Sequence, residues 1–322
     1  MKFKDIYEFA IKKGIEKDPR SKSDIKRVLS ENRKEYNKLS AIRKNTFDKE
    51  RLRHPYDDTR MLYGNPSAEI RTIIVGVDME VGELLVADRL REKGMDIDLV
   101  MAHHPEGWAW AGFYHVMDMQ ADVLRNLGIP YEIGKELLNE RMSEVGRAVS
   151  AANHMRAVDA ARLLDIPYMC VHTPADNHVN NYLQKLLDDR KPKTLKDVIA
   201  LLDTVPEYKD ASRKNAGAFI MIGKEKDKAG KIVVDMTGGT EGSKRVFPRL
   251  SQAGVGTIIG MHFSEEHFKA AQKEHINIIV AGHISSDTLG LNLLLDSLCE
   301  KDDFEIIDCS GFVRIPRKGK TK

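Results

Sequence analysis

Two adjacent histidines, His103 and His104, stand where a short apolar segment, residues 97–102, gives way to Pro105. Imidazole nitrogens are common ligands of divalent transition metals in proteins. Proline has no N–H and keeps the residue before it out of the α region, so the chain must leave His104 extended. At such a strand end the two rings can splay apart and serve two neighbouring ions. An HHP tripeptide by itself is weak evidence for a metal site.

Two further segments place an aspartate four positions after a histidine, again directly after an apolar run. His172 precedes Asp176, and His283 precedes Asp287. A carboxylate such as that of Asp176 can bridge two cations, because its two oxygens can bind ions that lie about 3.5–4 Å apart. Each aspartate could instead cap the helix predicted to start beside it, which is an ordinary role for Asp. The three segments together favour one shared cation pair over unrelated helix caps.

The segments that must position these residues are short runs of branched apolar residues that alternate with longer helical patterns. Strands are predicted at residues 70–77, 97–102, 166–171, 218–222, 232–235, 257–260, 276–281 and 304–308. Helices are predicted at residues 80–93, 116–127, 135–149, 151–164, 178–190, 194–203, 243–253, 264–275 and 286–299. This alternation indicates βαβ units and an α/β fold with a mostly parallel sheet. Parallel strands end at one edge of a sheet, so we expect the histidine motifs to converge there.

The order of these motifs resembles that of the NGG1p-interacting-factor-like family, also labelled GTP cyclohydrolase type 2-like, whose members are dinuclear metal proteins of α/β fold. The similarity covers about residues 70–312. The family's HHP motif is matched at residues 103–105 and its H-T-x-x-D motif at residues 172–176. Its G-H-x-x-x-E motif is matched at residues 282–287, where Asp287 stands in place of the expected Glu. Three ordered motifs in one chain make a specific match.

The resemblance implies a set of metal ligands: His103, His104, Asp176, His283 and Asp287. It places His172 either among the ligands or beside them. It also implies two similar α/β lobes with the site between them, two bound divalent ions, and a ring-shaped homo-oligomer, with a hexamer expected. The shorter arm of Asp287 either keeps bidentate binding through a shift of the helix start or weakens one ion site. Histidine with carboxylate suits zinc, iron, manganese, cobalt or nickel.

Two divalent ions held by two carboxylates keep a net positive charge, and metal binding lowers the pKa of water toward neutrality. A bridging hydroxide at such a site would attack carbonyl, amidine or phosphoryl centres. We therefore predict a metal-dependent hydrolase for a small substrate, with nucleotide-like compounds among the candidates. His172 and Glu106 are the candidate catalytic side chains, the latter as a general base. The alternative is a metal-binding scaffold or a regulatory, metal-handling protein, whose coordination sphere would be closed to water.

Two loops beside the motifs offer further polar and aromatic groups. Residues 106–115 follow the HHP motif and contain both tryptophans of the chain. Such a loop can stack on a planar substrate or close over the site, or it can be an apolar plug or subunit contact. Residues 237–244 are rich in glycine and lie between a predicted strand and helix. They can cradle a phosphate, although a tight turn is the commoner meaning of such glycines.

The first 66 residues differ in character from residues 67–322, which form the predicted metal-binding α/β domain. Residues 1–60 carry 18 Lys and Arg against 11 Asp and Glu, whereas the rest of the chain carries 33 against 38. We predict a basic helical extension over residues 1–66, either a solvated extension or an oligomer arm. The alternative is a segment that binds DNA or an acidic partner. We do not expect a nucleic-acid partner, because the charges are mixed and no aromatic residues are interleaved for base stacking.

The composition limits the class of protein and its location. The chain has 322 residues, of which 42% are hydrophobic and 31% charged, as in globular proteins with a sizeable core. No apolar run reaches the roughly 18 residues that a membrane span needs, and the N-terminus has no apolar signal-peptide region. Three cysteines without CxxC spacing indicate reduced thiols. We therefore expect a cytoplasmic protein with no membrane partner and a small-molecule substrate.

Overall fold

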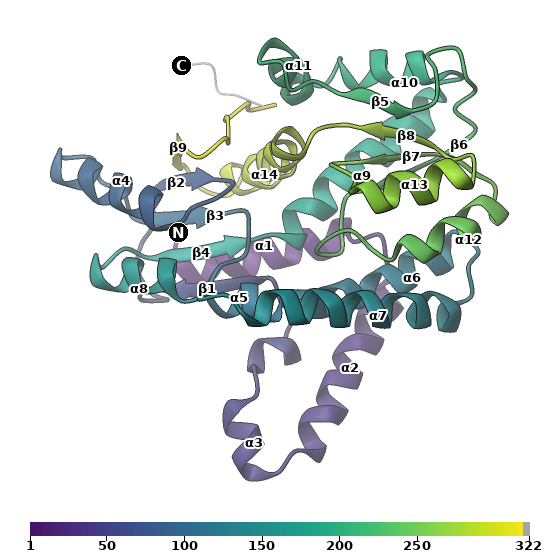
Figure 1. Cartoon of the computed structure of the whole chain (residues 1–322). Coiled ribbons are helices and arrows are strands. Elements are labelled where there is room, and N and C mark those ends of the chain that lie inside the picture. The colour runs from purple at the N-terminus through teal and green to yellow at the C-terminus, as the bar shows by residue number, and fades with distance from the viewer. Residues whose placement is uncertain (318–322) are drawn as a thin grey trace.

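The computed structural model describes residues 1–317 and arranges them as two β-sheets with helices between and around them (Figure 1). The strands are β1 (Thr59–Tyr63), β2 (Thr72–Gly76), β3 (Leu99–Ala102), β4 (Tyr168–Val171), β5 (Phe219–Ile222), β6 (Lys231–Asp235), β7 (Val255–Gly260), β8 (Asn277–Val280) and β9 (Glu305–Asp308). Eight of the nine lie within or overlap the predicted strands. The exception is β1, which the sequence analysis placed in a helical segment.

The helices complete the element order. The α-helices before the second sheet are α1 (Phe3–Lys17), α2 (Lys22–Lys38), α3 (Ala41–Thr46), α4 (Val81–Glu92), α5 (Gly107–Gly112), α6 (Met119–Asn126), α7 (Tyr131–Ser150), α8 (Arg156–Leu163), α9 (Thr173–Arg190), α10 (Leu195–Leu202) and α11 (Pro206–Arg213). The α-helices that follow strand β6 are α12 (Phe247–Gln252), α13 (Glu265–Lys273) and α14 (His283–Cys299). Short 3-10 helices are η1 (Lys49–Leu52), η2 (Phe113–Asp118) and η3 (Lys244–Val246).

Both sheets follow the same plan. The first has the strand order β1-β4-β3-β2-β9, in which only β1 runs antiparallel to its neighbour. The second has the order β5-β8-β7-β6, in which only β5 runs antiparallel. The central strands β2, β3 and β4 are buried along their whole length, as expected when helices cover both faces of a parallel sheet. The predicted fold of two similar, mostly parallel α/β lobes is confirmed.

Helices α9 and α14 follow the strands β4 and β8 and pack against each other between the two sheets (Figure 1). A side chain at Gly290 of α14 would bring its Cβ within 2.5 Å of the backbone carbonyl oxygen of Ala175 in α9. Only glycine therefore permits this close helix crossing. The crossing matters for the site because Asp176 lies in the first turn of α9 and Asp287 is the fifth residue of α14.

The N-terminal segment does not behave as one solvated extension, and that expectation is wrong for α1 and β1. Residues Phe3, Ile6 and Tyr7 of α1 are buried in the same apolar core as strands β2 and β3. Strand β1 pairs with β4 inside the first sheet. By contrast, α2 and α3 project from the body (Figure 1). The division into domains at residue 66 stays a prediction.

Strand β1 could not be recognised from the sequence because the buried residues at its start are polar. Asp58, Thr59 and Arg60 are all at most 1% exposed, so no alternation of apolar and polar residues marks the segment. The charge of Arg60 is balanced by Asp48 and Asp57, which lie up to twelve residues earlier in the chain. Burial of a charged residue depends on such partners, which local sequence patterns do not reveal.

Among the described residues, no helix has the length and apolar character needed to cross a membrane.

Candidate metal centre

The three histidine motifs meet at the carboxyl ends of the parallel strands. Ala102 of β3 pairs with Cys170 of β4, so His103 and His172 leave adjacent strands at the same edge of the first sheet. Their ring centroids are 5.0 Å apart. His283 begins α14, directly after β8 of the second sheet, and its ring lies 5.2 Å from that of His104. The convergence predicted from the motif positions is therefore present, and it joins the two lobes.

Three overlapping groups of side chains could each hold a metal ion, because their ligand atoms lie within 4.8 Å of one another. The groups are His103 with His104 and His172, His104 with His283 and Asp287, and His103 with Asp176 and Asp287. All five predicted ligands and His172 take part. The cluster contains imidazole and carboxylate groups only, a donor set that suits borderline divalent transition metals.

Neighbouring acceptors fix which nitrogen of three rings is free. His103 Nδ1 donates to the carbonyl oxygen of Val171 at 3.1 Å, and His104 Nδ1 donates to Asp78 at 2.6 Å. His172 Nδ1 donates to Asp58 at 2.9 Å. Because each acceptor requires a proton on Nδ1, Nε2 is the nitrogen of each ring that can bind a metal ion when the ring is neutral. This is the arrangement by which supporting residues orient histidine ligands in metal sites.

The two aspartates do not cap helices, so the alternative role considered for them is wrong. Helix α9 starts at Thr173 and α14 starts at His283, which places Asp176 and Asp287 inside the helices rather than at their N-caps. Asp176 Oδ1 and both carboxylate oxygens of Asp287 are buried without a hydrogen-bond partner, as is His103 Nε2. Buried polar atoms without partners are rare in native proteins. Their shared position is the observation that points to a cation.

Short distances connect these unpartnered atoms. His103 Nε2 lies 3.4 Å from Asp176 Oδ1 and 3.3 Å from Asp287 Oδ1. Asp287 Oδ2 lies 3.6 Å from His104 Nε2 and 3.5 Å from His283 Nε2. The two oxygens of Asp287 thus face different histidines. The side chain of Asp287, one methylene shorter than the Glu expected here, lies close to both sets of histidines.

In the absence of an ion, the histidines and aspartates of the cluster stabilise each other's charged forms. Burial alone would lower the pKa of His103, but Asp287 and Asp176 raise it to about 10. Burial alone would raise the pKa of Asp287, but His103, His283 and His104 lower it to about 2. A proton on His103 therefore supplies positive charge that the buried carboxylates require. A divalent ion would supply that charge instead.

A cavity of about 380 Å³ opens beside the cluster and extends to the carboxyl ends of β6 and β7. His104, His172, Asp176 and His283 are among its lining residues. Its wall contains apolar side chains, which include Trp110, Phe113, Met236, Phe247, Leu250, Met261 and Phe263. Its other carboxylates are Asp78, Glu80, Glu106, Asp235 and Glu241, and no Lys or Arg occurs among the described lining residues.

Glu106 lies in this cavity wall, in the same cavity as four members of the cluster. Burial and the nearby carboxylate of Glu80 raise the pKa of Glu106 to about 7. A carboxyl group with such a pKa can exchange a proton near neutral pH. Trp110 and Phe113, from the aromatic loop, line the cavity as well, whereas Trp108 is 43% exposed. The glycine-rich loop also lines it through Thr237, Gly239 and Gly242.

Two carboxylates that hold the histidines were not predicted from the sequence. Asp58 is fully buried and accepts hydrogen bonds from His172 Nδ1 and from the Thr173 hydroxyl. Asp78, at the end of β2, accepts from His104. The signal for Asp78 was present, because it follows an apolar strand as the histidines do. No local signal marked Asp58, which reaches the site only through the pairing of β1 with β4.

Comparisons with known proteins give structural neighbours. No protein-family model matches the chain, and no curated protein matches it. A solved NIF3 superfamily protein from Sphaerobacter thermophilus is 26% identical, covers 80% of this chain and 92% of its own, and has a TM-score of 0.68. Reduced HcgD from Methanocaldococcus jannaschii is 14% identical, covers 79% of this chain and 89% of its own, and has a TM-score of 0.51. The second likeness concerns the fold alone. The chain thus has the NIF3 fold of two similar lobes.

Proposed function

We propose that this chain is a member of the NIF3 superfamily and a hydrolase that depends on two divalent metal ions. The observation that carries the proposal is the set of unpartnered atoms at the junction of the lobes, His103 Nε2, Asp176 Oδ1 and both oxygens of Asp287. The residues present fit a metal, because imidazole and carboxylate groups with fixed tautomers meet there without satisfying one another. We see no pattern of residues that would recognise guanine, so the GTP cyclohydrolase label is not part of this proposal.

The distances support a division of ligands between two ions. His103 and Asp176 would hold one ion, and His104 and His283 the other. Asp287 would serve both, because Oδ1 faces His103 while Oδ2 faces His104 and His283. Asp176, the bridging ligand predicted from the sequence, directs its oxygens toward His103 and His172 instead. The shared ligand in this proposal is therefore Asp287.

The chemistry that divalent ions supply in such a setting is activation of water and polarisation of a carbonyl or phosphoryl oxygen. The chain's own contribution lies in the cavity beside the cluster. Glu106, with its pKa raised to about 7, would accept and return a proton there. Trp110 and Phe113 would cover a planar substrate and limit access of bulk water.

The charge of the cavity wall favours one of the substrate classes considered. A phosphate-bearing nucleotide would meet five carboxylates in addition to those of the cluster and no lysine or arginine among the described lining residues. A neutral or cationic ring, such as a cyclic amide or amidine, would instead find acceptors in the carboxylates and stacking surfaces in the aromatic residues. We therefore place the substrate among small, nitrogen-rich cyclic compounds.

Metal content of the purified protein tests the metal assignment. We expect about two ions per chain by elemental mass spectrometry after reconstitution, and about one or none in Asp176→Ala. Asp189→Ala is the matched control, since Asp189 is exposed on the same helix α9 and should leave the metal content unchanged. Retention of two ions in Asp176→Ala would contradict the assignment.

Hydrolysis assays separate the enzyme from the metal-handling alternative. The metal-loaded protein should open the rings of cyclic amides, such as dihydropyrimidines, faster than it hydrolyses p-nitrophenyl phosphate. Glu106→Gln should lower the turnover while the metal content stays the same. A protein that holds two ions and turns over neither compound class would favour the scaffold or metal-handling function.

A further inference from the structure

Helices α2 and α3 and the 3-10 helix η1 form a projection that the metal centre does not use. We call residues 22–53 the basic arm. Figure 1 shows α2 leading away from the body and α3 at the far end of the projection. The arm contains 11 Lys and Arg against 5 Asp and Glu, a net charge of +6, whereas the rest of the chain carries a net charge of −4.

Every acidic residue of the basic arm is in an ion pair. Asp24 pairs with Arg125 at 2.8 Å, and Asp48 pairs with Arg60 at 2.6 Å. These two ion pairs connect the arm to the body of the protein. The other three acids pair within the arm, in the pairs Glu31–Arg27, Glu35–Arg51 and Glu50–Arg53. The acidic charge of the arm is therefore already neutralised by arginine.

Eight basic residues of the arm have no carboxylate partner among residues 1–317. They are Lys22, Lys26, Arg33, Lys34, Lys38, Arg43, Lys44 and Lys49. Seven of the eight are exposed, and the eighth, Lys44, lies over the ring of Tyr36 at 5.3 Å. The charges that look mixed in the sequence are thus separated in the structure, and the surface left to solvent is positive.

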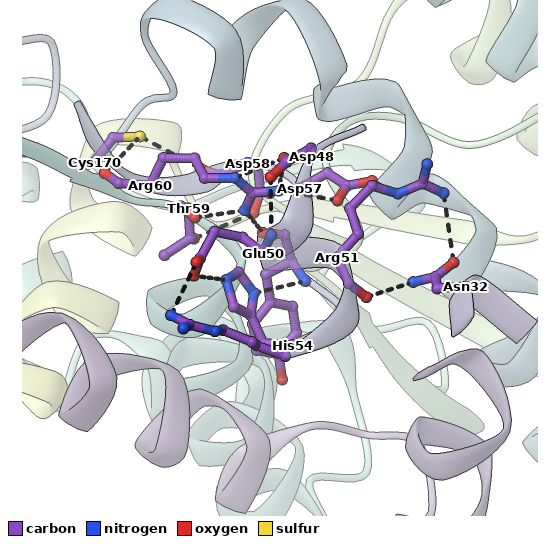
Figure 2. Close-up of polar contacts among 12 residues, drawn as sticks. Asn32, Asp48, Glu50, Arg51, His54, Asp57, Asp58, Thr59, Arg60 and Cys170 are labelled. Atoms are coloured by element: carbon purple, nitrogen blue, oxygen red, sulfur yellow. Dashed lines mark hydrogen bonds and ion pairs between the residues drawn. The ribbon is translucent and has the colours of Figure 1, made fainter. Parts of the chain in front are cut away.

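The arm is fixed on the body rather than loosely attached. Arg27 donates two hydrogen bonds to the buried carboxylate of Asp122, at 2.9 and 2.7 Å. At the other end of the arm, Figure 2 shows Arg60 of β1 between Asp48 and Asp57. Arg51 bonds Asn32 of α2 and pairs with Asp57. A surface held at both ends loses little conformational entropy when a partner binds.

The spacing of the basic residues on α2 fits a polymer of regularly spaced anions. Lys22, Lys26 and Arg33 are four and seven residues apart and therefore lie on one face of the helix, and Lys34 and Lys38 extend the positive surface around it. At a rise of 1.5 Å per residue, the shared face of Lys22, Lys26 and Arg33 is about 17 Å long. Duplex DNA presents one negative charge for about every 1.7 Å of its axis. An array of this length can neutralise several phosphates at once.

We propose that the basic arm binds the phosphate backbone of double-stranded DNA without reading its sequence. A single strand would need free aromatic side chains for base stacking, whereas Tyr36 and Phe47 pack against each other at 5.2 Å. A membrane would need an apolar face, whereas Ile42 is the one large apolar residue of the arm that is mostly exposed among those described. A helix fits the major groove of B-form DNA, about 12 Å wide, but not the narrow groove of A-form RNA.

Fluorescence anisotropy with a labelled 24-base-pair DNA duplex tests the proposal on the full, metal-loaded chain. We expect dissociation constants on the order of 1–100 µM at 0.1 M salt, independent of the DNA sequence. If about five phosphates are neutralised, the logarithm of the binding constant should fall with the logarithm of salt concentration at a slope of about −4.5. The same measurement with double-stranded RNA of equal length should give weaker binding.

A charge-reversed variant locates the binding surface. Arg33→Glu with Lys34→Glu should weaken DNA binding at least about tenfold and make the salt slope less negative by about two. The matched control changes two exposed lysines outside the arm, in the loop between β5 and β6, as Lys224→Ala with Lys226→Ala, and should bind DNA as the unchanged chain does. Both variants should retain the metal content of the unchanged chain, which shows that they fold.

Three outcomes would overturn the proposal. One is a salt-independent affinity for DNA, and a second is an equal loss of binding in the arm variant and the control. The third is binding to double-stranded RNA, or to vesicles of anionic lipid, that equals or exceeds binding to DNA. Since the metal content is read separately, failure of this proposal leaves the proposed hydrolase function untouched.

Discussion

The candidate metal centre and the basic arm both carry charge that the described chain does not neutralise, and they differ in where that charge lies. In the metal centre, Asp287 is 1% exposed and neither of its oxygens has a hydrogen-bond partner. On the arm, lysines such as Lys22 and Lys38 stand in solvent. One region is negative and enclosed, and the other is positive and exposed.

Because of this difference, the two regions depend on their partners in different ways. An uncompensated charge inside a protein is expensive, so the metal centre needs a compensating ion or proton at all times. An exposed charge is stabilised by water and screened by salt, so the arm is stable without a partner and its binding depends on ionic strength. The ion or proton of the metal centre is therefore a permanent part of the folded structure, whereas the partner of the arm binds reversibly.

The largest effect should come from titrating the metal-free centre. The pKa of His103 is about 10 in the folded protein, against an ordinary value of 6.5. A raised pKa in the folded state adds stability that is complete below pH 6.5 and is lost as the pH rises toward 10. Urea unfolding of the chelated protein should therefore show falling stability from pH 7 to pH 9.

The metal-loaded protein is the control for this titration, because His103 must be neutral to bind an ion. Its stability should lack this alkaline decline, and loading at pH 8 should release about one proton per chain, read with a pH indicator. Stability of the metal-free protein that stays level or rises between pH 7 and pH 9 would show that the enclosed charge is compensated in another way.

A smaller effect should follow from breaking the charge compensation at the root of the arm. Arg60 is 1% exposed and pairs with Asp48 and Asp57 (Figure 2). Arg60→Met should lower the free energy of unfolding by about 3 kcal/mol, because it leaves carboxylates without their partner. Arg53→Met, which removes an exposed pair with Glu50, should cost less than about 1 kcal/mol. Equal losses in the two variants, by urea unfolding, would contradict the comparison.

The smallest effect is expected at Asp58, which supports a ligand of the centre from the N-terminal segment. Asp58→Ala removes the acceptor of His172 Nδ1 and should weaken metal binding about 10- to 100-fold. Asp58→Asn keeps an acceptor oxygen and should lose less. Titration against a competing chelator measures both.

Cys170→Ala is the control for Asp58→Ala, since the buried Cys170 side chain packs beside Asp58 and its Sγ lies 3.6 Å from the Asp58 carbonyl oxygen. It should change metal affinity little although it removes buried volume. An equal loss of affinity in Cys170→Ala and Asp58→Ala would mean that packing, rather than the orientation of His172, determines metal binding.

Most of the fold and the centre could be predicted from the sequence. The motifs at residues 103–105 and 172–176 each follow an apolar run, and parallel strands end at one edge of a sheet, so their meeting could be predicted. The motif at residues 282–287 follows a strand of the second sheet, and only the packing of the two lobes brings it to the other two. The prediction failed where the interacting residues lie far apart in the sequence. The buried charge of Arg60 hid β1, and Asp58 has no local sign of its role at His172.

The sequence by itself determined which residues can bind a cation and that the first 60 residues are basic, because residue types and strand periodicity are local properties. Only the tertiary structure decided which charges remain without partners. It pairs Asp24 and Asp48 of the arm with arginines of the body and leaves the lysines of α2 in solvent. It also directs the two oxygens of Asp287 toward different histidines. Pairing depends on distances of a few ångströms between residues far apart in the chain, and those distances exist only in the fold.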